Sequence, residues 1–195
     1  TCCAMTPRIS RRKNIHIRLL VNNAAVGRWG YFEETPLQVY QQIIEVNIVA
    51  MVSLCHEFLE DLISFDTSAI INISSQAAYN PMPFMAVYGA TKAFVSSFSQ
   101  ALYGEWEEQG VLVQTFVPGP TATEFDEKAG GYVASVKDRG SPKSVVATSL
   151  AHLTRGTPVA TNARGLFKQR LFSALCPAKT VIKTVARMFE PPKAD

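Results

Sequence analysis

The chain lacks most of the features that mark membrane-spanning, secreted or nucleic-acid-binding proteins. No run approaches the roughly 18 consecutive apolar residues that span a bilayer, and the first residues lack the apolar core of a signal peptide. The net charge of the 195 residues is only +3 and the basic residues are scattered, so no nucleic-acid partner is expected. Internal repeats and low-complexity segments are also missing. Since 47% of the residues are apolar, one globular domain with a substantial core is predicted.

Cysteine is sparse and shows no metal-ligand spacing. The four cysteines are Cys2, Cys3, Cys55 and Cys176, and no metal site is predicted from them. Cys55 falls within an apolar helical pattern, where a buried and reduced thiol is expected. A reduced thiol together with the missing signal peptide predicts a cytoplasmic protein.

Residues 1–14 form a polar, Arg-bearing stretch without helical or strand periodicity. We therefore expect an irregular beginning at residues 1–14 and a single domain over residues 15–195. The first residue is Thr1 rather than Met, and a stretch with Arg but no acidic residues is typical of an organelle transit peptide. A truncated or misspliced beginning is the preferred explanation, with the transit peptide as the alternative.

Hydrophobic periodicity predicts strands that alternate with helices. Short apolar runs rich in β-branched residues predict strands, and apolar residues at helical spacing predict helices. The predicted strands cover residues 15–21, 68–73, 111–117 and 157–160, and the predicted helices cover residues 35–64, 84–108 and 142–154. Such alternation indicates an α/β fold with parallel strands and right-handed crossovers.

Two segments after the third strand have a less regular pattern. The region after Thr123 contains several glycines and little apolar periodicity, as in a mobile cover over a cleft. The last segment, Leu166–Met188, mixes apolar residues with five basic ones. Such a stretch contacts a membrane or a partner in some proteins, but a core-packed helix with a solvated polar face is the preferred interpretation.

The pattern with the most chemical content is Ser-x12-Tyr-x3-Lys, formed by Ser75, Tyr88 and Lys92. Lys92 follows Tyr88 by one helical turn, so its ammonium is predicted to lower the tyrosine pKa from a reference value of roughly 10. Ser75, just past an apolar strand, would hold a substrate oxygen while Tyr88 gives or takes a proton. Ser74 is the alternative serine, but the spacing to Tyr88 favours Ser75. On its own, Tyr-x3-Lys would more often be ordinary helix surface.

Three further motifs accompany this one. Asn-Asn-Ala-Ala at residues 22–25 ends the first strand, Asn47 lies in the long helix, and Pro-Gly-Pro-Thr-Ala-Thr at residues 118–123 follows the third strand. In this order and spacing the chain resembles the short-chain dehydrogenase/reductase family from about Ile17 to Thr123. The family's chain opens with a glycine-rich Thr-Gly-x3-Gly-x-Gly turn, and this sequence contains no such pattern.

The resemblance implies a Rossmann-like, doubly wound parallel sheet, here incomplete because its N-terminal strands are missing. It also implies an NAD(P)-dependent oxidoreductase that interconverts a carbonyl and an alcohol. Tyr88 would be the catalytic acid/base, Ser75 would steady the reacting oxygen, and Lys92 would also bond the nicotinamide ribose. Asn47 would hold a water that links Lys92 to solvent as a proton relay.

The resemblance implies contacts to the cofactor, NAD or NADP, from the ends of two strands and from the helix that carries the motif. These residues are Asn22, Asn23, Ala24, Tyr88, Lys92, Pro118, Gly119, Thr121 and Thr123. The expected substrate is a small apolar carbonyl or alcohol compound, because apolar side chains flank the motif. They are Met82, Pro83, Phe84 and Phe125.

Full-length members of the family commonly form homodimers or homotetramers, and the helix with Phe94, Phe98 and Leu102 would then be buried between subunits. The alternative hypothesis is a catalytically inactive fragment that serves only as a structural or oligomerisation partner. It is motivated by the missing glycine-rich turn, since a dinucleotide pyrophosphate binds to converging backbone N–H groups at such a turn. Affinity for the cofactor is then expected to fall.

Overall fold

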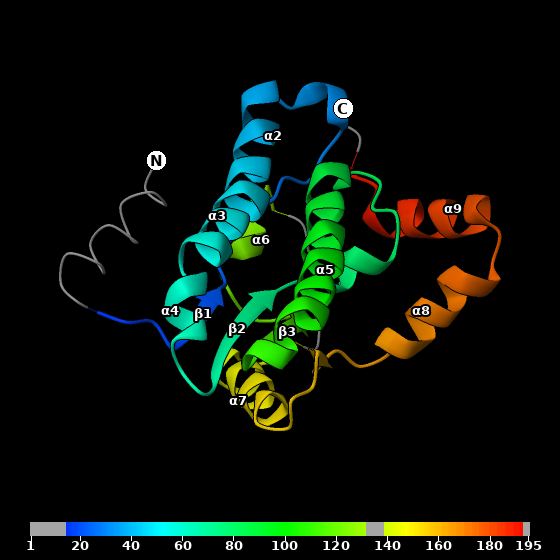
Figure 1. The fold of residues 1–195 in the computed structure, drawn as a ribbon. Coiled ribbons are helices and arrows are strands. Elements are labelled where there is room, and N and C mark those ends of the chain that lie inside the picture. Colours follow the sequence, from blue (N-terminus) through cyan, green and yellow to red (C-terminus); the bar gives the residue numbers. More distant parts are fainter. Residues whose placement is uncertain (1–14, 132–138, 193–195) are drawn as a thin grey trace.

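The computed structural model describes residues 15–131 and 139–192, which form an α/β fold on one parallel sheet (Figure 1). Its strands are β1 (Leu19–Asn22), β2 (Ser68–Ile73), β3 (Val111–Val117) and β4 (Val159–Thr161). They lie side by side in chain order, and every neighbouring pair is parallel. Because parallel neighbours need a crossover, helices occur between successive strands. The predicted fold class is confirmed, whereas the predicted irregular stretch at residues 1–14 lies outside the described residues.

Burial differs between the strands of the sheet. β2 and β3 are covered on both faces, as is typical of central parallel strands built from near-continuous apolar runs. In β1, by contrast, Leu19 and Val21 are exposed and the residues between them are only partly buried. β1 also begins four residues later than the predicted strand at residues 15–21.

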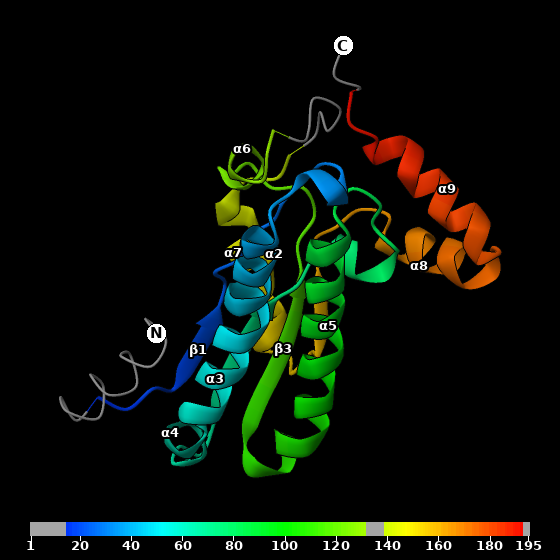
Figure 2. The same ribbon diagram turned by 90° about the horizontal axis from the view of Figure 1, so that it is seen from above.

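One face of the sheet is covered by the helices that precede and follow β2. These are α2 (Leu37–Ile44), the π-helical turn η2 (Glu45–Val49), α3 (Ala50–Glu57), α4 (Leu59–Ile63) and α5 (Ala86–Trp106). Figure 2 shows α2, α3 and α4 following one another beside α5. The main hydrophobic core lies between these helices and the sheet and includes Cys55, Leu62, Ile70, Val95 and Val113. Cys55 is a free, buried thiol, as predicted.

The prediction of one continuous helix over residues 35–64 is wrong, because the helix is interrupted at two places. The π-helical turn interrupts the α-helical pattern at Glu45–Val49, and the chain leaves helical geometry at Phe58, whose φ is −97° and ψ 2°. Among the described residues, the helical stretch Leu37–Glu57 is long and apolar enough to cross a membrane by length and composition alone. Core helices of globular proteins meet the same criterion, and Ile43, Met51 and Cys55 of this stretch are buried.

The other face of the sheet is covered by α7 (Pro142–Leu153). Its first turn is capped by Ser141, whose hydroxyl accepts a hydrogen bond from the Ser144 N–H at 3.2 Å. The remaining short elements are the 3-10 turns η1 (Phe32–Glu34), η3 (Gln76–Tyr79) and η4 (Glu107–Gln109) and the helix α6 (Phe125–Lys128). The predicted cover after Thr123 thus contains α6, and part of it lies outside the described residues.

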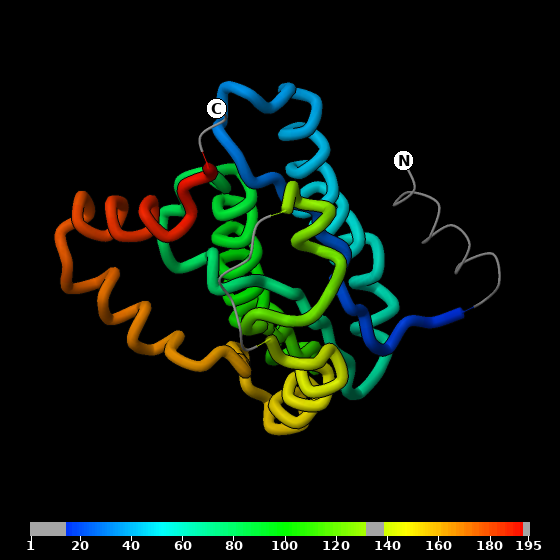
Figure 3. The backbone as a smooth tube through the Cα atoms, turned by 180° about the vertical axis from the view of Figure 1, so that it is seen from behind, coloured from blue at the N-terminus to red at the C-terminus, as the bar shows by residue number. Residues whose placement is uncertain are grey.

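The chain ends in two helices, α8 (Leu166–Leu175) and α9 (Ala178–Phe189). Figures 1 and 3 show them at the side of the molecule beyond α5, on the opposite side from β1. The indole Nε1 of Trp29, in the loop after β1, donates a hydrogen bond to the Phe189 carbonyl at 2.8 Å. The end of α9 is therefore joined to the loop that borders the candidate site.

Candidate active site

The three residues of the Ser-x12-Tyr-x3-Lys motif meet at the edge of the sheet where the strands end. Ser75 follows β2 by two residues, and Tyr88 and Lys92 lie in the first two turns of α5. The Ser75 hydroxyl also accepts a hydrogen bond from the Ala77 N–H at 3.1 Å, which opens η3. The carboxyl ends of parallel strands are where α/β sheets place ligands. The chain thus brings the motif to the edge of the sheet at which a binding site is expected.

Within the motif, the Ser75 side chain lies close enough to the Tyr88 phenol to act on its ionisation, and it favours a lower pKa of the phenol. The Lys92 ammonium lies 5.8 Å from the centroid of the Tyr88 ring and donates a hydrogen bond to the Ile73 carbonyl at 2.9 Å. The alternative serine, Ser74, is turned away, because its hydroxyl bonds to the Lys92 carbonyl at 3.0 Å. The structure therefore places Ser75, and not Ser74, beside Tyr88.

The predicted fall in the Tyr88 pKa is wrong, because the pKa is raised instead. Burial raises the pKa of the Tyr88 phenol to about 12; the Ser75 side chain acts in the opposite direction, and the negative charge of Asp126 adds to the rise. Burial also lowers the pKa of the Lys92 ammonium to about 8. As a whole residue Tyr88 is only partly buried, and the Phe125 ring packs against its ring. Tyr88 is therefore held in its protonated form near neutral pH.

Asn47 lies at the centre of the π-helical turn, and its amide is fully engaged. The amide Nδ2 donates to the Val26 carbonyl at 2.9 Å and to the Thr91 hydroxyl at 3.0 Å, and Oδ1 accepts from the Val26 N–H at 2.9 Å. These bonds join the loop after β1 to the helix that carries Tyr88. Asn47 thus fixes the backbone around the site, and the proton relay predicted for it stays a prediction.

An aromatic side chain from α6 covers Tyr88. The rings of Phe125 and Tyr88 are tilted against each other with centroids 5.1 Å apart. Gly27 lies beneath both rings, and a Cβ at this position would approach the Phe125 ring to 2.8 Å and the Tyr88 ring to 3.1 Å. The absence of a side chain at residue 27 therefore allows Phe125 to pack over the phenol.

The predicted cofactor residues after β1 point in two directions. The Asn22 amide turns into the core, where it donates to Asn72 Oδ1 at 2.8 Å and to Cys55 Sγ at 3.4 Å. Through Asn72 it thus braces the neighbouring strand β2, and the cofactor contact expected of Asn22 stays a prediction. Asn23 and Ala24 are exposed at the edge of the sheet.

The loop after β3 is held by bonds within itself and to β4. The Gly119 N–H donates to Asn162 Oδ1 at 2.9 Å, and the Thr121 hydroxyl donates to the Gly119 carbonyl at 2.8 Å. The Thr123 hydroxyl accepts a hydrogen bond from the Phe125 N–H at 3.4 Å. Pro118 begins this loop directly after β3. Both threonine hydroxyls bond within their own loop, and the cofactor contacts expected of Thr121 and Thr123 stay a prediction.

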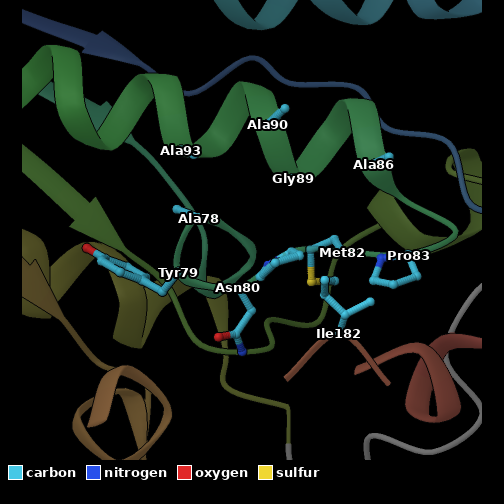
Figure 4. A pocket seen from close by; sticks show the side chains of 11 residues that line it. Ala78, Tyr79, Asn80, Met82, Pro83, Ala86, Gly89, Ala90, Ala93 and Ile182 are labelled. Carbon is cyan, nitrogen blue, oxygen red and sulfur yellow. The ribbon is translucent and has the colours of Figure 1, made fainter. Parts of the chain in front are cut away.

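An apolar cavity of about 600 Å³ lies between the start of α5, the loop that precedes it and Ile182 of α9 (Figure 4). Its walls are the loop around Met82 and Pro83, the small residues Ala86, Gly89, Ala90 and Ala93 of α5, and Ile182 of α9. Of the four predicted substrate contacts, Met82 and Pro83 line this cavity. Phe125 covers Tyr88 instead, and the edge of the Phe84 ring packs against Tyr31 with centroids 5.4 Å apart.

Three residues with a structural part in the site escaped the sequence analysis. Thr91 and Gly27 pack around Asn47 and Tyr88, and Asn162 holds the Gly119 backbone. Asn162 follows β4 as Asn22 ends β1, so a polar residue at a strand end was an available signal. Thr91 and Gly27 gave none, because their importance depends on contacts between distant segments.

Comparisons with known proteins agree with this geometry. The family model described as short chain dehydrogenase matches residues 8–131. Very-long-chain 3-oxoacyl-CoA reductase of Bos taurus is 30% identical over 158 residues, which cover 74% of this chain and 48% of that protein. Hydroxysteroid dehydrogenase-like protein 1 of Gallus gallus is 34% identical over 115 residues, covering 58% of this chain and 35% of that protein. The chain thus spans about half or less of the length of these relatives.

Solved structures show the same fold. A short-chain dehydrogenase from Sphingobium yanoikuyae in complex with NADPH superposes with a TM-score of 0.74 at 25% identity, covering 99% of this chain and 72% of that chain. A short chain dehydrogenase from Burkholderia cenocepacia in complex with NADP gives a TM-score of 0.76 at 22% identity, covering 97% and 77%. The family model matches more than half of the sequence and includes the whole Ser75, Tyr88 and Lys92 motif. On these grounds the chain belongs to the short-chain dehydrogenase family.

Proposed function

We propose that this site serves an NAD(P)-dependent oxidoreductase that interconverts a carbonyl and an alcohol on an apolar substrate. The observation that carries the proposal is the convergence of Ser75 and Lys92 on Tyr88, with the Lys92 ammonium 5.8 Å from the centroid of the phenol ring and Ser75 beside the phenol. Such an arrangement both holds a substrate oxygen and supplies a proton to it. The relatives named as a 3-oxoacyl-CoA reductase and as hydroxysteroid dehydrogenase-like support the same class of reaction.

The protonation state of Tyr88 favours the reducing direction. With a pKa of about 12, the phenol carries its proton near neutral pH. A carbonyl oxygen placed beside Ser75 would accept a hydrogen bond from that hydroxyl and take the proton of Tyr88. The phenolate left behind would be stabilised by the Lys92 ammonium, since opposite charges at this separation attract strongly in a partly dry site.

The donors at the site suit the nicotinamide end of the cofactor. NADH or NADPH, when bound, supplies the hydride that reduces the carbonyl carbon. The Lys92 ammonium has three N–H donors, and the Ile73 carbonyl accepts from one of them, so donors remain for ribose hydroxyls. Tyr88 would share the ribose, and Asn23, Ala24 and the loop at residues 118–123 lie at the strand ends that border it. These residues fit the cofactor, with NAD and NADP as equal alternatives.

The substrate we propose is a carbonyl compound with an extended apolar part, such as a fatty acyl thioester or a steroid. The apolar cavity beside α5 is within the size range of small-molecule pockets. Neither Ser75 nor Tyr88 lines it, but Gly89, the residue after Tyr88, does. We therefore assign the cavity to the remote part of the substrate, with the reacting carbonyl at Ser75.

Cofactor binding is tested by tryptophan fluorescence on this chain. Trp29 borders the site, whereas Trp106 lies at the far end of α5, so Trp106→Phe isolates the signal of Trp29. Saturable quenching at micromolar NADH or NADPH is expected. No response up to millimolar cofactor would favour the alternative hypothesis of an inactive oligomerisation partner. Of the residues expected at a subunit contact, Phe94 is exposed and stacks on Phe98 with centroids 5.5 Å apart, whereas Phe98 packs partly against the main core and Leu102 is buried in it.

The catalytic assignment is tested by Tyr88→Phe. Reduction of 3-oxoacyl thioesters, oxosteroids and aromatic ketones is followed by loss of NAD(P)H absorbance. The substitution is expected to lower turnover by about 10²- to 10⁴-fold, because the proton donor is lost, with cofactor affinity nearly unchanged. Tyr103→Phe is the matched control, since Tyr103 lies on the same helix and its hydroxyl donates to Glu107 at 2.6 Å, far from the site. Retained turnover in Tyr88→Phe would refute the assignment.

A further inference from the structure

Helix α8 turns an apolar stripe toward solvent. Phe167, Leu171 and Leu175 recur every fourth residue and therefore share one face of the helix. Their exposed fractions are 77%, 46% and 74%, whereas Leu166 at the start of the helix is buried in the core with Val117. A surface helix normally buries its apolar face. The preferred interpretation of the last segment as a core-packed helix with a solvated polar face is therefore wrong for α8.

The same segment concentrates positive charge. Residues 166–189 contain five of the nineteen Lys and Arg residues of the chain and none of its sixteen Asp and Glu residues. Lys168 and Arg170 flank the apolar stripe of α8. Lys179, Lys183 and Arg187 recur every fourth residue on α9, and all three are exposed. The inward face of α9 carries the buried Val181 and Val185, so that its basic residues form the outer face.

Both helices are fixed to the body of the molecule. On α8, Gln169 Nε2 donates to the Gln76 carbonyl at 3.0 Å, and the Ser173 hydroxyl is bonded to the Asn80 side chain. On α9, the Phe189 carbonyl accepts from Trp29. The two helices lie at the side of the molecule beyond α5 (Figure 3). The apolar stripe is therefore presented outward by a folded scaffold.

We propose that the α8–α9 surface, defined by the apolar stripe Phe167, Leu171 and Leu175 and the five basic residues of residues 166–189, binds an anionic lipid bilayer. A helix that lies in the membrane interface buries apolar side chains among the acyl chains while Lys and Arg contact lipid phosphates. A second copy of the chain fits less well, since a symmetric contact would bring like surfaces together and oppose five positive charges to five.

The proposal places the bilayer next to the apolar cavity. Ile182 of α9 lines that cavity, as does Tyr79, and the Arg170 guanidinium lies over the Tyr79 ring at 5.1 Å. An apolar compound dissolved in the bilayer would thus meet the cavity close to the lipid surface. The membrane contact itself does not depend on the proposed reaction, and it is tested without any assay of turnover.

The test is sedimentation of the chain with sucrose-loaded vesicles of phosphatidylcholine alone or of phosphatidylcholine with one third phosphatidylserine. Binding is expected to the phosphatidylserine vesicles and to weaken as salt increases. Phe167→Ser with Leu175→Ser is expected to lower the partition coefficient by more than about tenfold, because two apolar insertions are lost. Lys168→Gln and Lys183→Gln are each expected to lower it by about fivefold.

The matched control is Val146→Ser with Leu150→Ser on α7, whose side chains are exposed by 56% and 43%. Circular dichroism and light scattering on every variant establish folding and mass. Absence of vesicle binding at low salt overturns the proposal, as does an equal loss in the α7 control. A drop in mass of the Phe167→Ser, Leu175→Ser variant without any vesicle binding overturns it as well, and assigns the stripe to a protein contact.

Discussion

Helices α5 and α8 depart from the usual helix pattern in opposite ways. On α5, polar residues are buried: Thr91, Lys92, Ser96 and Ser99 are at most 5% exposed. On α8, by contrast, the apolar residues Phe167, Leu171 and Leu175 are exposed. Buried polar groups on α5 are bonded to the sheet or to the segments around Tyr88, whereas Phe167 and Leu175 of α8 are 77% and 74% exposed. The first arrangement builds a site inside the molecule, and the second leaves a surface outside it.

The two arrangements differ in what they contribute to stability. Burying a polar group costs free energy unless a hydrogen bond replaces water, so each polar residue of α5 constrains its partner. Ser99 illustrates this, since its hydroxyl accepts from the Asn72 amide at 2.9 Å and donates to the Val95 carbonyl at 2.6 Å. An exposed apolar group makes no comparable demand. Substitutions on α5 should therefore change folding, and those on α8 only association.

The largest effect on the free energy of unfolding is expected from Lys92→Met, measured as a function of pH. Burial lowers the pKa of Lys92 from 10.5 to about 8, so between these pH values the unfolded chain holds a proton that the folded chain has released. Stability from this residue is present above pH 10.5 and is lost as pH falls to about 8. The difference in free energy of unfolding, parent minus variant, should therefore rise by about 3 kcal/mol from pH 7 to pH 10.5 in urea titrations.

Subtracting the free energy of unfolding of the Lys92→Met variant from that of the parent cancels the contributions of the other titrating groups. Burial raises the pKa of Cys55 to about 11 and that of Tyr88 to about 12, so both lose stability as pH rises, but they do so equally in parent and variant. A difference that stays flat across this range would show that Lys92 is not held in a dry environment.

Asn72→Leu is expected to have a smaller effect on folding. Asn72 is fully buried and accepts from Asn22 as well as donating to Ser99. Leucine of similar volume would remove one hydrogen bond from Asn22 and one from Ser99, at a cost of about 2 kcal/mol. Gln109→Leu is the control, because Gln109 is exposed and bonds only to the Glu105 carbonyl among the described residues. Equal stability of the two variants would argue against this buried network.

The smallest effect on folding is expected from Phe167→Ser on α8. Because the side chain is largely exposed, the free energy of unfolding should change by less than about 0.5 kcal/mol in urea titrations. A loss above about 2 kcal/mol would mean that the stripe is packed against another part of the chain, and the contrast between α5 and α8 would then be lost.

Local sequence patterns were sufficient for much of the fold. The strand at residues 68–73 and the strand at residues 111–117 agree with β2 and β3 to the residue, because both are apolar runs bounded by turn residues. Gly110 ends the preceding helical segment with a φ of +78°, a conformation that glycine adopts readily. The π-helical turn at Glu45–Val49 could not be predicted, because it follows from bonds that Asn47 makes to Val26 and Thr91, 21 and 44 residues away.

The candidate site was predicted less completely than the fold. Spacing brought Ser75, Tyr88 and Lys92 together, since a strand end and two helical turns fix their separation. The pKa of Tyr88 was predicted in the wrong direction, because proximity of a charge is visible in a sequence and burial is not. Phe125, which causes part of that burial, is 37 residues beyond Tyr88, and only the folded chain places it there.

The absence of a side chain at Gly27, in the loop after β1, determines how closely Phe125 can cover the Tyr88 phenol. With its Cβ 2.8 Å from the Phe125 ring, alanine would displace this aromatic cover. Water would then reach the Tyr88 hydroxyl, and its acidity would return toward that of free tyrosine. A single methyl group, added at a residue that performs no chemistry, would in this way retune the proton donor of the site.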